Sequence, residues 1–218
     1  DLVAIGTVCD VADLTDYNRF FVIEGLKLIL NRQNKVISKI IDNSNFISTP
    51  TSTDLAFNIG PQLNAASRID DSFLHFKLLT NKDMSEVEKI SRKLLLLNEK
   101  RKLIENQIYE EALIQAEEQK NSNFILVYGN NWHNGVIGII ASKLVSKFNK
   151  PSIVISFGNS YGTGSARSIQ SIDLSKIIHL AKDKKILIDG GGHKMAAGIK
   201  INKDLLTQFK SFLDNFFK

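Results

Sequence analysis

The chain has 218 residues, of which 43% are hydrophobic, and contains 3 prolines and a single cysteine, Cys9. This length allows one large globular domain or two small ones. A single cysteine excludes an intrachain disulfide framework and favours a reducing, cytoplasmic location. No apolar run approaches the roughly 20 residues that a membrane-spanning helix needs. Because the chain opens at Asp1 inside an apolar pattern, without a methionine or a signal peptide, we expect a fragment of a longer protein.

The net charge of +5 is distributed unevenly along the chain. Residues 1–120 contain 15 Lys and Arg against 18 Asp and Glu, whereas residues 121–218 contain 13 against 5. A basic second part predicts a polyanionic partner, with nucleic acid as the first candidate. A solvated, lysine-rich surface explains the same charge equally well, so charge alone leaves both explanations open.

The first part of the chain has few regular patterns. Residues 2–8 are apolar and predict a buried strand, residues 18–30 predict a helix, and residues 43–53 predict a loop. Residues 83–119 contain neither glycine nor proline, and their apolar side chains recur mostly every three or four positions. This pattern predicts one helix about 54 Å long, which we expect to bridge two lobes. A coiled coil is the alternative, although the leucine run at 94–97 interrupts a heptad repeat.

Strands and helices alternate in the second part of the chain. The patterns predict strands at 124–128, 152–157, 185–189 and 198–201, and helices at 135–148, 173–181 and 205–217. Asp173 is a candidate cap for the second of these helices. The alternation predicts an α/β fold with a largely parallel sheet.

Asp10 stands where the first expected strand ends, which is where an open sheet presents its ligands. Its carboxylate is a candidate ligand for Mg²⁺ or Mn²⁺, because both ions prefer oxygen. Asp13 is either a neighbour of that site or a helix cap. Spacing alone favours simple capping of the following turn for both residues.

Asn64 and Arg68 lie four positions apart in a segment rich in small residues, so a helical turn would place them on one face. The guanidinium of Arg68 could then bind a phosphate with two parallel hydrogen bonds. The alternative is a surface ion pair between Arg68 and Asp70 or Asp71.

His133 precedes the helix that we expect to begin near Gly135. Free N–H groups at a helix start can bind an anion, and the His133 imidazole could donate to the same anion. Plain helix capping is the commoner role for a single histidine at such a position.

Residues 162–168 read Gly-Thr-Gly-Ser-Ala-Arg-Ser. The hydroxyls of Ser165 and Ser168 flank Arg167, which is a combination suited to holding a phosphate or a sugar-phosphate group. A dinucleotide-binding loop does not fit, because the third glycine is missing. The alternative is a glycine hairpin with an exposed arginine.

Three successive glycines, Gly190, Gly191 and Gly192, precede His193. Such a run costs backbone entropy and packs no side chain, which favours a backbone nest that lets a phosphate approach closely. His193 could donate a hydrogen bond to the same phosphate. A flexible turn is the alternative.

Taken together, these segments resemble the DHH phosphoesterases and, within them, the RecJ family. Residues 190–198 resemble the signature of the DHH-associated domain, and residues 2–13 resemble the last metal-binding motif of the DHH domain. Residues 60–68, 132–139 and 164–168 are similar to RecJ segments, and the long helix is similar to its interdomain helix. The resemblance covers nearly the whole chain, with its motifs in the expected order.

The resemblance implies an α/β fold in three parts. Residues 1–82 would be the remnant of a parallel-sheet DHH catalytic domain, and residues 83–120 the long interdomain helix. Residues 121–218 would form a smaller α/β DHH-associated domain that binds substrate.

The resemblance also implies a function, the exonucleolytic degradation of single-stranded DNA from the 5′ end in repair and recombination, with Mn²⁺ or Mg²⁺ as cofactor. Asp10 would be the last aspartate of a two-metal site, and Arg68 would assist in gripping DNA. Partners would be single-stranded DNA and, as candidates, a helicase and a single-strand-binding protein, with a monomeric state and no membrane. The phosphates would be held by Ser165, Arg167, Gly190, Gly191, Gly192 and His193.

The chain departs from the RecJ pattern at Gln62, where arginine is usual, and at Ser67, where glycine is usual. The motifs Asp-x-Asp and Asp-His-His do not occur in the sequence, so we expect no nuclease activity from these 218 residues alone. Two other classes stay open. One is a DHH phosphoesterase acting on short oligonucleotides or nucleoside phosphates, and the other is a non-catalytic nucleic-acid-binding module.

Overall fold

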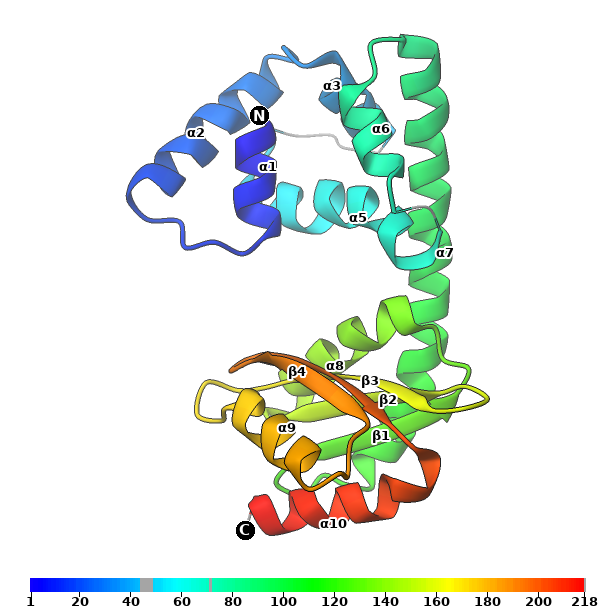
Figure 1. Cartoon of the computed structure of the whole chain (residues 1–218). Coiled ribbons are helices and arrows are strands. Elements are labelled where there is room, and N and C mark those ends of the chain that lie inside the picture. Colours follow the sequence, from blue (N-terminus) through cyan, green and yellow to red (C-terminus); the bar gives the residue numbers. More distant parts are fainter. Residues whose placement is uncertain (44–48, 71, 218) are drawn as a thin grey trace. The chain divides into compact units, whose positions relative to one another are not determined.

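A computed structural model describes residues 1–43, 49–70 and 72–217 (Figure 1). The chain forms two compact units, Asp1–Arg101 and Lys102–Lys218. The boundary falls inside α7 (Met84–Glu117), a helix of 34 residues that contributes to both units. The single helix predicted for residues 83–119 is therefore confirmed, whereas the three-part division at residues 82 and 120 stays a prediction.

The described part of the first unit consists of helices and contains no strand. Its core gathers Ile37, Ile40, Leu55, Leu78 and Leu94, all of which are almost fully buried. A π-helical segment, Leu55–Ile59, connects the fourth helix to the fifth. The helices are α1 (Leu2–Cys9), α2 (Asp16–Leu30), α3 (Lys35–Asp42), α4 (Ser52–Asp54), α5 (Gly60–Ile69), α6 (Leu74–Thr80) and the start of α7.

The strand predicted for residues 2–8 is wrong, because this segment forms the helix α1. Ala4 and Ile5 are adjacent and both buried, a pattern that a strand with alternating faces does not produce. Short apolar runs fit a strand and a buried helix equally well, so the sequence could not separate the two. As a result, Asp10 follows the last turn of a helix and does not end a strand.

Helices α1 and α2 approach each other through two very small residues. A β-carbon placed on Gly25 would overlap the Cβ of Ala4, whereas a β-carbon placed on Gly6 would find no atom within 4 Å. We therefore expect Gly25→Ala to destabilise the protein by about 1–3 kcal/mol through overpacking. Its matched control, Gly6→Ala in the neighbouring helix, should stabilise it slightly, by up to about 1 kcal/mol. Urea unfolding of both variants measures the difference, and equal stabilities would contradict the close contact.

The helix predicted for residues 18–30 is confirmed as α2, whereas α3 and α6 were not foreseen. The predicted loop at 43–53 includes residues 44–48, which lie outside the described residues. Near its end, Thr51 caps the short helix α4, because its hydroxyl accepts from the backbone N–H of Asp54 at 3.3 Å.

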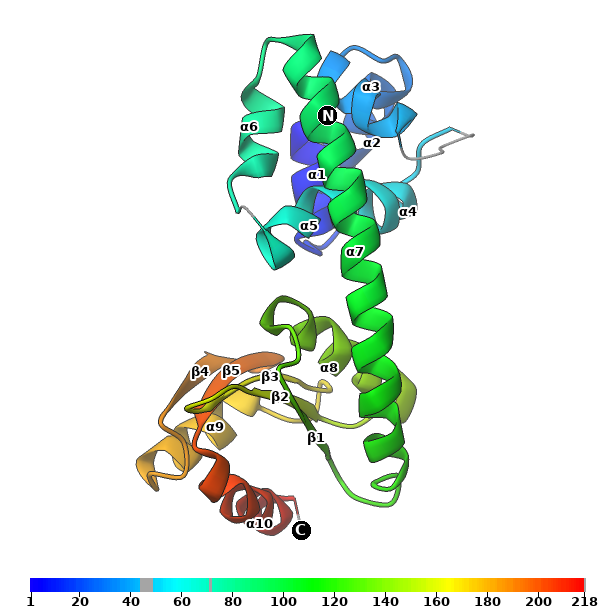
Figure 2. The ribbon, with the colours of Figure 1, turned by 90° about the vertical axis from the view of Figure 1, so that its right-hand side faces the viewer.

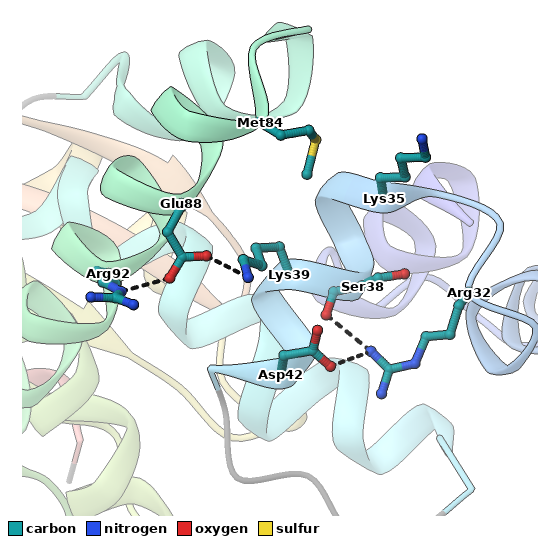
Figure 3. Close-up of a pocket in the computed structure, with 8 residues that line it drawn as sticks. All are labelled: Arg32, Lys35, Ser38, Lys39, Asp42, Met84, Glu88 and Arg92. Carbon is teal, nitrogen blue, oxygen red and sulfur yellow. Dashed lines mark hydrogen bonds and ion pairs between the residues drawn. The ribbon is translucent and has the colours of Figure 1, made fainter.

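A pocket of about 600 Å³ lies where α3 faces the first turns of α7 (Figure 3). Both of its carboxylates are paired with cations. Asp42 accepts from Arg32 at 2.8 Å, while Glu88 lies 2.7 Å from Lys39 and 2.6 Å from Arg92. The Lys39–Glu88 pair joins α3 to α7, whereas Arg92 and Glu88 both lie on α7. Both carboxylates of the pocket are therefore already paired with cations of the protein.

The second unit is built on one five-stranded sheet in the order β1-β2-β3-β5-β4. The α/β class is confirmed, but the expected parallel pairing holds only between β1 and β2, and the other three pairs are antiparallel. The connections from β2 to β3 and from β4 to β5 are too short for a crossover, which forces antiparallel pairing. The strands are β1 (Ile125–Asn130), β2 (Ser152–Phe157), β3 (Gly162–Arg167), β4 (Asp189–His193) and β5 (Ala196–Ile201).

Helices cover the two faces of this sheet unequally. Helices α9 (Leu174–Asp183) and α10 (Leu206–Phe216) pack on one face, and α8 (Asn134–Phe148) packs on the other (Figures 1 and 2). On the α8 side, the apolar core involves strands β1 and β2. Further along the same face, β-carbons placed on Gly191 and Gly198 would meet no atom within 4 Å. This part of the sheet is therefore open.

Two sequence predictions in the second unit were displaced. The strand expected at 185–189 is wrong in position, because the strand β4 begins at Asp189 and contains the glycine run. Residues 162–167, for which a glycine hairpin was the alternative, form the strand β3. The remaining expected strands and helices of this unit appear within about two residues of their predicted ends, and Asp173 caps α9 as predicted.

The outer edge of β1 is closed by two glutamines, Gln115 of α7 and Gln119 in the turn just after this helix. Gln119 donates to the carbonyl of Leu126 at 2.9 Å and accepts from its N–H at 3.0 Å. Gln115 does the same for Tyr128, at 2.8 and 3.1 Å. The two side-chain amides thus imitate a neighbouring strand, and we call this pair the glutamine clamp. It covers backbone groups that an edge strand would otherwise present to other chains.

Candidate functional site

The antiparallel register aligns candidate residues that are distant in sequence. Ser165 pairs with Gly198, and Gly198 pairs with Gly191. In the next row on this face, Arg167 and His193 both pair with Ala196. Directly opposed residues share a face of a sheet, so Ser165, Arg167, Gly191 and His193 all belong to the open side. We call these four residues the strand-face site.

Arg167 is the central charge of the strand-face site. Its Nη1 donates to the Ser165 hydroxyl at 3.0 Å and to the Ala166 carbonyl at 2.9 Å. Burial lowers the pKa of the Arg167 guanidinium, which nevertheless stays charged near neutral pH. Within the described residues it forms no ion pair with a carboxylate. A half-buried cation without a counter-charge costs free energy, and a bound anion would remove this cost.

Helix α8 passes directly behind this arginine at Gly138. A β-carbon placed on Gly138 would lie 3.0 Å from Nη2 of Arg167 and 3.1 Å from Oγ of Ser165. The absence of a side chain at Gly138 therefore leaves the space that Arg167 and Ser165 occupy. The sequence offered no signal for this role, since the contact joins a helix to a strand 27 residues later.

The two candidate histidines, His133 and His193, both accept a backbone hydrogen bond at Nδ1. His133 caps α8, because its Nδ1 accepts from the Gly135 N–H at 3.1 Å, which confirms the capping role. Nδ1 of His193 accepts from the Met195 N–H at 3.3 Å. When Nδ1 accepts, a neutral imidazole carries its proton on Nε2. Each ring thus keeps one outward donor for an anion.

The loop before α8 is anchored by a contact that the sequence did not reveal. The indole N–H of Trp132, a buried residue, donates to Glu111 of α7 at 2.7 Å. The Ser156 hydroxyl donates to the Trp132 carbonyl at 2.6 Å. These bonds fix the position from which His133 caps the helix.

The three glycines of β4 have different surroundings, and the predicted backbone nest is wrong. All three are extended residues paired with β5. A β-carbon on Gly190 would press on Ile178 of α9, and one on Gly192 would overlap the Ala196 carbonyl. Only Gly191 faces the open side. The close approach that the sequence suggested is therefore offered by a strand face, not by a loop.

Ser168 lies apart from the strand-face site. It follows the end of β3, is buried, and donates its hydroxyl proton to the Ile172 carbonyl at 2.9 Å. The structure thus gives Ser168 a role in the turn between β3 and α9.

The remaining candidates belong to the helical unit. Asp10 is exposed and ends α1, with its backbone N–H donating to the Gly6 carbonyl at 2.9 Å. A β-carbon on Gly60 would overlap Sγ of Cys9, so the start of α5 lies against the end of α1. Asn64 and Arg68 follow on α5, four positions apart as predicted, with Asn64 exposed and Arg68 partly buried.

The described residues do not form a metal site by themselves. No group of three or more His, Cys, Asp or Glu side chains gathers anywhere in these segments. Asp10 supplies one carboxylate, which is too few for a site that holds two hard cations. No helix in the same segments is long and apolar enough to cross a membrane.

The chain is similar in sequence to one known domain family and to known exonucleases. Residues 121–218 match the DHHA1 domain family. Over 222 residues the chain is 36% identical to the single-stranded-DNA-specific exonuclease RecJ of Salmonella typhimurium, a match that covers 96% of this chain and 38% of that protein. The chain is a RecJ homologue. It spans little more than a third of the length of this RecJ relative.

Solved RecJ structures have the same fold over this region. The crystal structure of Thermus thermophilus RecJ in complex with Mg²⁺ matches with a TM-score of 0.88 at 29% identity, covering 98% of this chain and 33% of that one. A RecJ structure bound to manganese matches with a TM-score of 0.82 at 30% identity, covering 100% and 54%. The helical unit, the long helix and the mixed sheet are therefore RecJ features.

Proposed function

We propose that this chain is the nucleic-acid-gripping part of a RecJ-type exonuclease that degrades single-stranded DNA from its 5′ end in repair and recombination. The observation that carries the proposal is Arg167, a half-buried cation without a carboxylate partner on an open strand face. Phosphate is the anion that such a site would meet in a polyanionic strand.

Each residue of the strand-face site has a distinct task in this proposal. Arg167, steadied by Ser165, binds phosphate oxygens through the guanidinium N–H groups that its internal bonds leave available. Gly191 lets the sugar-phosphate backbone approach the sheet, and His193 donates from Nε2. Because these contacts read phosphate and not base edges, they hold a strand without regard to its sequence.

Asp10 has a different role in the proposal. It would act as one ligand of a divalent Mg²⁺ or Mn²⁺ site that groups from the complete protein would finish. Metals there would activate water and stabilise charge on the phosphodiester. Asn64 and Arg68 would contact the strand nearby, and the consequences of Gln62 and Ser67 for that contact stay predictions. Helicase and single-strand-binding protein as partners are likewise predictions.

The chain alone is expected to bind single-stranded DNA but not to cut it. One carboxylate cannot hold two metals, so hydrolysis requires ligands that these residues do not supply. The test incubates the purified 218-residue protein with a 5′-labelled strand and Mn²⁺, alongside a binding titration. Robust metal-dependent degradation would overturn the assignment of Asp10 to an incomplete site. Absence of any binding would overturn the proposed function.

Gly138→Ala is expected to separate binding from stability. The added methyl improves helix propensity by up to about 1 kcal/mol, but it crowds Arg167 and Ser165 at 3.0 and 3.1 Å. We expect an unchanged or slightly higher Tm and a loss of single-strand affinity of about threefold, since displacing one contact by a few tenths of an ångström weakens a charged hydrogen bond only in part. Ser146→Ala, an exposed change later in α8, is the control. If both variants bind single-stranded DNA with equal affinity, the DNA does not contact Arg167 and Ser165.

A further inference from the structure

A pocket of about 550 Å³ opens in the second unit where the parallel strands β1 and β2 end and α8 begins. It contains none of the four residues of the strand-face site, although His133, a candidate anion donor, also lines it. Carboxyl ends of parallel strands are common ligand positions in α/β proteins. The polar groups that matter are the carboxamides of Asn131, Asn134 and Asn159 and the hydroxyls of Ser160 and Thr163.

The lining of this pocket is polar but carries no charged residue. In the described structure, the side-chain amides of Asn131, Asn134 and Asn159 make no hydrogen bond to protein groups. A carboxamide places a donor beside an acceptor, the arrangement that pairs with the edge of a nucleobase. The chemistry thus suits a neutral, planar, hydrogen-bonding group better than a phosphate.

An aromatic ring stands at the same pocket. Tyr161 lines it and is 41% exposed, so part of this residue is accessible to a ligand. Lys200 lies 3.7 Å from the centre of this ring, a cation–π contact that limits its movement. Stacking on a fixed aromatic ring is how many proteins hold unpaired bases.

The pocket adjoins the strand-face site. Thr163 lies two residues before Ser165 on the same face of β3, so the two are about 7 Å apart. A single nucleotide can bridge this separation. A phosphate held by Ser165 and Arg167 would therefore leave its own or the adjacent base within reach of the carboxamides.

We propose that this pocket receives one unpaired nucleobase of the strand whose phosphate is bound at Arg167. The inference rests on the proposed function and adds to it a contact with a base. It requires a single strand, because in a duplex the base edge is already paired. The three carboxamides would act as specificity-determining groups, with Tyr161 as the stacking surface.

The experiment compares two ligands of equal length, an ordinary oligonucleotide and a strand whose sugars all lack bases. Fluorescence anisotropy with the 218-residue protein gives both affinities. We expect the ordinary strand to bind about tenfold more tightly, the size of effect that one stacked and hydrogen-bonded base provides. The variant Asn134→Ala/Asn159→Ala should lose most of this difference and keep its affinity for the abasic strand. Asn131 is left in place, because its φ of 56° suits asparagine better than alanine.

The controls separate the possible failures. Asn106→Ala, on the exposed side of α7, should change neither affinity. Arg167→Ala should weaken both ligands equally. If the double variant keeps the tenfold preference, or if the unaltered protein binds both strands equally, the base pocket is refuted while the proposed function stands. If the protein binds neither strand, the proposed function itself fails.

Discussion

Replacing Arg167 by alanine is expected to lower the affinity for single-stranded DNA by about tenfold to a hundredfold. Hydrogen bonds to charged groups contribute about 1.5–3 kcal/mol each, and Arg167 is the half-buried cation of the strand-face site. Loss of one phosphate contact should also reduce the slope of log affinity against log salt by about 0.7. Titrations at several salt concentrations measure both quantities. The substitution removes a desolvated charge, so the fold should not lose stability.

Lys176→Ala is the matched control for this substitution. Lys176 is an exposed cation of α9, which packs on the opposite face of the sheet. Its removal lowers the net charge by the same amount, and it should leave the affinity within about twofold, as expected for an exposed charge far from the strand. If both variants weaken binding equally, the effect is one of overall charge and the role of Arg167 is refuted. An unchanged salt slope in Arg167→Ala would have the same meaning.

The double substitution Gln115→Ala/Gln119→Ala is expected to lower the free energy of unfolding by about 2–6 kcal/mol. It removes the four hydrogen bonds of the glutamine clamp, each with a net contribution of about 0.5–1.5 kcal/mol. The exposed edge of β1 should then pair with other chains. Urea unfolding measures the first effect, and light scattering against protein concentration measures the second.

Gln107→Ala provides the comparison for the clamp. Gln107 is exposed on the same helix, and its replacement makes the same change in helix propensity without touching β1. It should leave stability within about 0.5 kcal/mol, as for other surface substitutions. If the double variant has the same unfolding free energy and the same light scattering as this control, the glutamine clamp is refuted. Water would then replace the two side-chain amides without loss of stability.

Local signals in the sequence predicted much of the second unit. A run without glycine or proline predicted the long helix α7, and the cap residue Asp173 predicted the start of α9. β2 is a mostly apolar, fully buried run that matches its predicted ends. In each case the information lies within a few residues of the element, which is the range over which periodicity and capping act.

The errors arose where distant partners decide the structure. Residues 2–8 form a helix that packs Ala4 against Gly25 of α2, and the glycines of β4 form a strand that pairs with β5. Arg167 and His193 could be named as separate candidates, but their common face depends on a register through Ala196. The contact at Gly138 has no local signature at all.

The glutamine clamp blocks one of the two edges of the sheet against the addition of a further strand. At β1, the side chains of Gln115 and Gln119 occupy the positions that an added strand would need. At the other end of the sheet, β4 pairs only with β5. Any extended segment that joins this sheet through its backbone must therefore do so beside Gly191 and His193. The strand that carries Gly191 and His193 is thus also the edge at which two copies could associate by mistake. Substitutions that flatten or lengthen β4 therefore carry an aggregation risk that equivalent changes in β1 do not.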